Sequence, residues 1–343
     1  MKNSFSRRNF INTTATIGTG VCTQSILLSE NKPSSEFPNI NPKKKVIKTG
    51  FHTDVKYLKH LIGKGHPESP ERLKAIHQQL KISGTAKLTT PIKAKIDPLP
   101  YISQVHSDEH IQRVKHAALD ESICSTAVSG VLSAVNKVCS GELTNAFCAI
   151  RPPGHHAANN GPYGFCFYNN IAIAAKYAQS KFKLKKILTV DWDYHHGDGT
   201  EWAFYDDPSV LCFSTHALYA FPFSGSPNRT GVGKGKGFNI NVALPRKATD
   251  KDIITAFKNK LIPAADKFKP DLILISAGFD SRKDDRLGDF KITDTGFEEL
   301  TKIVMELAHK HCDSKIVSML EGGYNTQGLA LAVDTHIKAL LKG

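Results

Sequence analysis

Six short apolar segments, separated by stretches with helical spacing, constrain the fold of this chain more than any other feature. They are rich in Val, Ile, Leu and Phe, and they span residues 146–150, 187–190, 210–214, 238–244, 272–276 and 316–320. Such runs are typical of parallel strands covered on both faces. Apolar residues at spacings of three and four predict helices over 171–182, 250–268, 293–311 and 328–341. The alternation predicts one α/β domain whose parallel sheet is flanked by helices.

Polar residues gather directly after five of the predicted strands. The segments concerned are RPPGHHA (151–157), DWDYHHGDGT (191–200), Thr215-His216, AGFDS (277–281) and EGGYN (321–325). The carboxyl ends of parallel strands lie at one edge of a sheet, and ligand sites of open α/β sheets form there. We therefore expect these segments to meet at one rim and to form the functional site.

The segment after the second strand packs three carboxylates and two imidazoles into eight residues. Side chains two positions apart in an extended segment point the same way, so Asp193 and His195 can bind one ion together. Asp280 is the expected third ligand. Three protein ligands and one water form the open arrangement of a catalytic zinc site. Two carboxylates and one imidazole would also accept ferrous iron or cobalt.

Hydrolysis at such a site needs a base for the metal-activated water and an acid for the leaving amine. His155 and His156 can provide both if carboxylates hold their imidazoles. Tyr324, after two glycines, can donate a hydrogen bond to the developing oxyanion. Taken singly, these residues also fit an incidental His pair and a surface Tyr. Their coincidence at neighbouring strand ends favours the catalytic interpretation.

These motifs, in this order, resemble those of the histone deacetylase family, in its class II-like and bacterial branch. HPESPERL (66–73) and GFCFYNN (164–170) match as well, so the resemblance covers about residues 50–343. It implies the arginase–deacetylase fold, a three-layer α/β/α sandwich with a mostly parallel sheet of about eight strands. It also implies a hydrolase of linear amides that uses one zinc ion per chain to remove acetyl groups from lysine in proteins or peptides.

The resemblance assigns a role to individual residues. The zinc ligands would be Asp193, His195 and Asp280, and the catalytic residues His155, His156, Asp191, Asp198 and Tyr324. The substrate would be bound by Phe165, Phe221, Gly164, Asp120 at the rim, and Arg72 near an internal exit for acetate. A structural potassium ion would be bound by Asp191, Asp193, His195, Ser214 and Thr215. The family's D-P-L-G motif reads Asp285-Arg286-Leu287-Gly288 here.

Three alternative functions stay open at this point. A deacetylase of small acetylated amines, such as acetylpolyamines, would use the same chemistry. A ureohydrolase with two manganese ions shares the fold, but Gly197 and Arg282 stand where the second ion needs carboxylates. A non-catalytic binder of acyl-lysine or DNA would need neither Tyr324 nor the His pair.

The first residues differ from the body of the chain. Arg7 and Arg8, shortly before Phe10, resemble a twin-arginine export signal. We therefore expect an export signal over residues 1–29, a linker over 30–45 and a single catalytic domain over 46–343. This predicts a periplasmic or otherwise extracytoplasmic protein. The alternative is a disordered basic tail on a cytoplasmic enzyme.

Composition excludes several other classes of protein. The net charge is +13, but no basic stripe with interleaved aromatics is present, so we expect no specific nucleic-acid partner. The body lacks a run of about 18 uncharged apolar residues, which excludes a polytopic membrane protein. The seven cysteines include no C-x-x-C pair, so we expect buried free thiols rather than disulfides.

Overall fold

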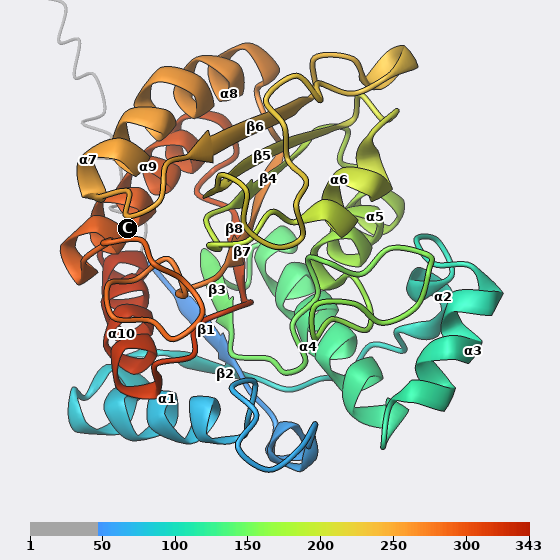
Figure 1. Cartoon of the computed structure of the whole chain (residues 1–343), viewed down its shortest axis with the longest axis vertical. Helices are drawn as coiled ribbons and strands as arrows, with labels where there is room; N and C mark the ends of the chain where they lie inside the picture. Colours follow the sequence, from blue (N-terminus) through green and yellow to red (C-terminus); the bar gives the residue numbers. More distant parts are fainter. Residues whose placement is uncertain (1–46) are drawn as a thin grey trace, which may run out of the picture. The chain divides into compact units, whose positions relative to one another are not determined.

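The computed structural model describes residues 47–343, which form an eight-stranded sheet with every neighbouring pair of strands parallel (Figure 1). The order across the sheet is β2-β1-β3-β8-β7-β4-β5-β6. The strands are β1 Thr49–His52, β2 Thr90–Ile92, β3 Asn145–Cys148, β4 Ile187–Asp191, β5 Val210–Ala217, β6 Asn239–Leu244, β7 Leu272–Ala277 and β8 Ile316–Leu320.

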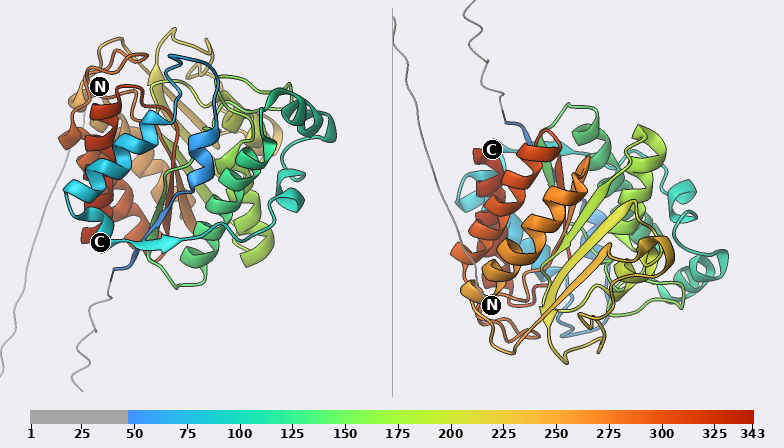
Figure 2. Two further views of the ribbon diagram at one scale, coloured as in Figure 1. Left: turned by 90° about the horizontal axis from the view of Figure 1, so that it is seen from below. Right: turned by 90° about the horizontal axis from the view of Figure 1, so that it is seen from above.

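Helices cover both faces of this sheet (Figures 1 and 2). One layer contains α1 Glu71–Ile82, α7 Asp250–Ala256, α8 Ile262–Phe268, α9 Asp294–His311 and α10 Thr326–Lys342. The other contains α4 Glu121–Cys139, α5 Asn170–Phe182 and α6 Asp198–Phe204, with α2 Leu99–Ile102 and α3 Asp108–Ala117 outside them. Short 3-10 helices span Val55–Lys59, Thr85–Leu88 and Gly233–Gly235. The predicted three-layer α/β/α sandwich is confirmed.

The central strands explain why the apolar runs in the sequence are almost continuous. Every residue of β3, β4, β5, β7 and β8 is buried, because helices press on both sides of the sheet. The edge strand β6 instead mixes buried and half-buried positions. All six strands predicted from the sequence are present, with ends that differ by no more than three residues.

Helix formation between residues 250 and 268 is interrupted, although the sequence predicts one helix there. The segment consists of α7, a π-helical turn over Phe257–Leu261, and α8. Pro263 lies in the first turn of α8. A proline has no N–H and its ring clashes with the carbonyl four residues earlier. A π turn just before it shifts the hydrogen-bond register and accommodates the ring.

Within residues 47–343, one helix is long and apolar enough to cross a membrane by length and composition, namely α4. Of its most apolar window, 67% is buried inside the protein. It packs against α5, β3 and β8, as a core helix does.

The described cysteines are free thiols. Five are buried and Cys139 is half-buried. Burial raises the pKa of Cys212 and of Cys312 to about 12, so these thiols stay protonated and act as small apolar groups. Cys22, the export signal expected over 1–29 and the linker expected over 30–45 lie outside the described residues.

Candidate active site

The order of the strands brings the polar segments together. β3, β8, β7, β4 and β5 are consecutive neighbours across the sheet. Three of the motif segments begin at or directly after the ends of β4, β7 and β8, and RPPGHHA begins three residues after β3 ends. Thr215 and His216 lie near the end of β5 itself. Because parallel strands end at the same edge, these segments form one continuous rim.

Asp193, His195 and Asp280 form a compact cluster at this rim. One ligating atom from each lies within 4.8 Å of the others. The Nδ1 atom of His195 lies 3.1 Å from Asp193 Oδ1 and 2.9 Å from Asp280 Oδ2. Both carboxylates are fully buried. Glycines leave room for them, because a Cβ at Gly278 would collide with Asp193 and a Cβ at Gly322 with both carboxylates.

The electrostatics of this cluster match a bound cation. Burial alone would lower the pKa of His195, but hydrogen bonds to Asp193 and Asp280 outweigh it and raise the pKa to about 10. Burial and the charge of Asp193 raise the pKa of Asp280 to about 7. Two buried carboxylates crowded around one point are stabilised by positive charge between them. The oxygen and nitrogen donors fit a divalent metal ion such as zinc.

The two neighbouring histidines each have a carboxylate partner. His155 Nδ1 donates to Asp191 Oδ2 over 3.0 Å, and His156 Nδ1 donates to Asp198 Oδ1 over 2.7 Å. Burial would lower the pKa of His155, but the charges of Asp193 and Asp191 raise it well above its ordinary value. Burial and the charge of His155 lower the pKa of His156 to about 4. The environment therefore shifts the pKa values of the two imidazoles in opposite directions.

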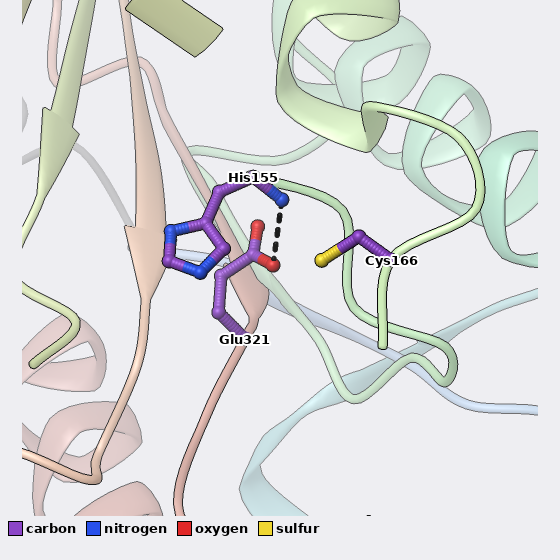
Figure 3. Close-up of side chains that lie close together, drawn as sticks. All are labelled: His155, Cys166 and Glu321. Carbon is purple, nitrogen blue, oxygen red and sulfur yellow. Dashed lines mark hydrogen bonds between the residues drawn. The ribbon is translucent and has the colours of Figure 1, made fainter. Parts of the chain in front are cut away.

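Glu321 binds the backbone of the loop that carries this pair. The sequence analysis did not predict this residue. Its Oε2 accepts hydrogen bonds from the backbone N–H groups of Gly154, over 2.7 Å, and His155, over 3.1 Å, and its Oε1 accepts one from Ser276. Figure 3 shows the Glu321 carboxylate between His155 and Cys166. The available signal was an acidic residue directly after a buried strand, in the same motif as Tyr324.

A cavity of about 390 Å³ opens at the cluster. The expected wall residues Phe165 and Phe221 both line it, and Gly164 and Phe165 have φ values of 55° and 68°. Phe221 contacts the rings of His156 and His195 edge-on. The cavity is lined by His156, Tyr163, Gly164, Phe165, His195, Phe221, Leu287 and Tyr324. Tyr163 and Leu287 were not predicted, because only the folded loops bring them to the rim.

Hydrogen bonds between other side chains and the backbone around Tyr324 hold this residue in the cavity. Asp285 Oδ2 accepts hydrogen bonds from the backbone N–H groups of Tyr324, over 2.7 Å, and Asn325, over 3.0 Å. Arg72 is fully buried, donates to the carbonyl oxygens of Gly323 and Glu321, and lies 5.1 Å from the centre of the Tyr324 ring. Arg72 therefore fixes the loop of Tyr324 and is not among the residues that line the cavity.

Three other expected residues occupy different environments. Asp120 is exposed at the N-cap of α4, where its side chain accepts from the N–H of Ser122, and it does not line the cavity. Ser214 pairs with His216 over 2.9 Å, and Thr215 Oγ1 donates to the carbonyl of Asp191 over 3.4 Å. The last two lie on β5, beside Asp191 at the end of β4.

Comparison with known proteins identifies the family. The model of the histone deacetylase domain matches residues 66–340. The chain belongs to the histone deacetylase family. A probable deacetylase of Archaeoglobus fulgidus is 34% identical over 86% of both chains.

Two eukaryotic relatives and one solved structure are also similar to this chain, in sequence and in fold respectively. Human histone deacetylase 9 and Arabidopsis thaliana histone deacetylase 5 are each 35% identical over 85% and 86% of this chain. The chain spans 34% and 49% of their respective lengths. The crystal structure of the HDA15 HD domain superposes with a TM-score of 0.81 and 33% identity, covering 87% of this chain and 89% of that one. This histone deacetylase family member is therefore a hydrolase with the α/β fold of its relatives.

Proposed function

We propose that this enzyme hydrolyses the amide of acetyl-lysine in a protein or peptide, with one zinc ion per chain. The observation that carries the proposal is a cavity lined by two aromatic rings and by His195, which belongs to the cluster with Asp193 and Asp280. A slot between Phe165 and Phe221 suits the apolar stem of an acyl-lysine. Deacetylases among the relatives support this class of reaction.

Asp193, His195 and Asp280 would hold the metal ion. A bound zinc ion would act as a Lewis acid on the amide carbonyl and lower the pKa of a water molecule. Ferrous iron or cobalt would suit the same donors. We also propose a structural potassium ion near Asp191, Asp193, His195, Ser214 and Thr215, because the side chain of Thr215 and the backbone of Asp191 converge there.

His156 is the proposed proton carrier. It lines the cavity, whereas His155 does not. Its Nδ1–H is bound to Asp198, so Nε2 is left to take a proton from the attacking water and return it to the leaving amine. His155, bound to Asp191, lies next to it with ring centres 4.0 Å apart. Asp191 and Asp198 orient the imidazoles and do not line the active-site cavity.

Tyr324 is the proposed donor to the oxyanion. Burial raises the pKa of its hydroxyl well above the ordinary value, so the group stays protonated and able to donate. Its loop is fixed by Asp285 and Arg72. The donor is therefore in position before the substrate arrives.

A turnover panel tests this proposal. Acetyl-lysine peptides, acetylated polyamines and peptides with longer acyl-lysines are compared by kcat/KM with the zinc-loaded enzyme. We expect the acetyl-lysine peptides to be the best substrates. Efficient turnover of acetylpolyamines without turnover of peptides would replace this proposal by the small-amine alternative.

We propose export of the protein through the twin-arginine-like segment around Arg7 and Arg8. A fusion of residues 1–45 to a reporter should deliver it outside the cytoplasm, and a fusion with both arginines changed to lysine should not. A reporter that stays in the cytoplasm in both cases would overturn the proposal.

A further inference from the structure

A second cavity, here called the side cavity, adjoins the candidate active site. Its volume is about 620 Å³, and it lies between α6, β6 and the rim loop, residues 218–229. Phe221 of the same rim loop lines the active-site cavity. Leu218, Tyr219 and Phe223 of the rim loop face the side cavity. The rim loop is therefore the wall between the two cavities.

The side cavity displays large aromatic side chains that the core does not use. The exposed fractions are 44% for Trp202, 85% for Tyr219 and 80% for Phe223. Tyr219 and Phe223 also have positive φ values of 59° and 62°. Positive φ is unfavourable for bulky residues, and such strain collects at binding sites. Exposure and strain at the same two residues point to a surface shaped for a ligand.

Buried polar residues hold the rim loop in place. His196 Nδ1 pairs with Ser224 Oγ over 2.7 Å, and His216 Nε2 donates to the carbonyl of Gly225 over 2.9 Å. Asn239 donates to the carbonyl of Arg229 over 2.6 Å. The aromatic side chains are therefore presented from a fixed backbone. This reduces the conformational entropy that the rim loop loses when a ligand binds.

The charges of the side cavity favour a cation. Asp198 and Glu201 contribute two carboxylates against the single guanidinium of Arg229 among the lining residues. Arg229 is already paired with Glu201, and it lies 4.6 Å from the centre of the Tyr205 ring. Asp198 accepts a hydrogen bond from His156 and keeps a side chain that is 28% exposed. Aromatic faces next to an exposed carboxylate are the surroundings that bind organic cations.

We propose that the side cavity binds a cationic side chain of the substrate, a Lys or Arg close to the acylated lysine. This rests on the proposed function, because an acyl-lysine between Phe165 and Phe221 leaves its backbone at the rim loop. The next residues of the peptide can then cross the rim loop to Tyr219 and Phe223. An anionic membrane would need free basic side chains here, whereas Arg229 is already paired.

Matched peptides test this subsite in the zinc-loaded enzyme. Each peptide carries one acetyl-lysine and, at one of the two positions on either side, either lysine or its uncharged analogue norleucine. We expect kcat/KM to be about five- to tenfold higher for the lysine peptide at one position at least. In Trp202→Leu with Phe223→Leu, the preference for lysine over norleucine should fall to about one.

Leu88→Ala is the control, since Leu88 is 66% exposed and lines neither cavity. It should keep the full preference for lysine. Equal kcat/KM for lysine and norleucine at every position overturns the subsite but leaves the deacetylase. A preference that survives in the double variant also overturns it. If no peptide is hydrolysed, the proposed function fails and the subsite fails with it.

Discussion

The carboxylate of Glu321 accepts three hydrogen bonds beside the His pair. Its removal should lower the free energy of unfolding. In Glu321→Ala the buried N–H groups of Gly154 and His155 lose their acceptor. An unsatisfied buried donor costs about 1–3 kcal/mol, so we expect the free energy of unfolding to fall by about 3 kcal/mol, measured by urea denaturation. Glu321→Gln, which retains an acceptor oxygen, should lose less.

The matched control for this prediction is Glu142→Ala. Glu142 is 56% exposed in an ion pair with Lys137, and exposed pairs contribute about 0–1 kcal/mol. Urea midpoints that drop equally for Glu321→Ala and Glu142→Ala would show that Glu321 does not support the loop.

Tyr324→Phe removes only the proposed oxyanion donor. Loss of one such donor lowers kcat by about 100- to 1,000-fold, and we expect this with little change in KM or in Tm. Tyr163→Phe is the control, because Tyr163 lines the same cavity and is 41% exposed. Steady-state kinetics on an acetyl-lysine peptide would contradict the role of Tyr324 if both variants kept wild-type kcat.

Individual site residues differ in how far the sequence could predict them. Asp193, His195 and Asp280 follow strands that the apolar pattern identifies, and the structure brings them together. Asp120 lies in a region of the sequence without a clear motif, and its side chain caps α4 instead of lining the cavity. Leu287 belongs to the cavity through the path of a loop, which no spacing rule determines.

Among the elements, buried histidines give the fold a predictable acid sensitivity. His336 of α10 bonds Thr301 of α9 and Ser318 of β8, and burial lowers its pKa to about 3. Between pH 3 and 6.5 the unfolded chain binds a proton that the folded chain does not, so stability falls as the pH decreases. At pH 5 this residue should cost about 2 kcal/mol relative to neutral pH.

His336→Gln tests this, because an amide can still bond both hydroxyl groups without titrating. Its loss of unfolding free energy between pH 7 and pH 5 should be about 2 kcal/mol smaller than that of the wild type. His116→Gln, at an exposed position of α3, should leave the wild-type slope. Identical slopes for all three proteins would rule out His336 as a source of the acid sensitivity.

Strands that the sequence did not predict are explained by their position in the sheet. β1 and β2 lie at one edge, with the sequences TGFH and TPI. They are short and contain no continuous apolar run, and Pro91 cannot donate to a ladder, which is tolerated at an edge. The ring of His52 is buried and pairs with the hydroxyl of Tyr57 and the carbonyl of Ile92. Contacts of this kind depend on tertiary structure and leave no periodic pattern.

At the scale of the whole molecule, the order of the strands in the sheet places segments that are distant in the sequence next to one another. The His pair follows β3, the third metal-ligand candidate follows β7 and Tyr324 follows β8, yet these strands are neighbours. The sequence predicted that the strand ends share an edge. It could not predict their order, because the order of the strands depends on pairing between segments that are distant in the sequence.

The proposed metal ion would join segments that follow different strands, so we expect it to stabilise the rim. Removal of the metal should therefore lower Tm. A ligand that binds only the folded state at about 1,000 times its Kd adds about 4 kcal/mol. Dialysis against a chelator should therefore lower Tm by roughly 8 °C, and one equivalent of zinc should restore it. Asp193→Ala breaks the ligand cluster, so its Tm should respond to neither step. The prediction is contradicted if elemental analysis shows that the wild-type protein has lost its metal and its Tm is nevertheless unchanged. The stability of the rim would then not depend on metal binding.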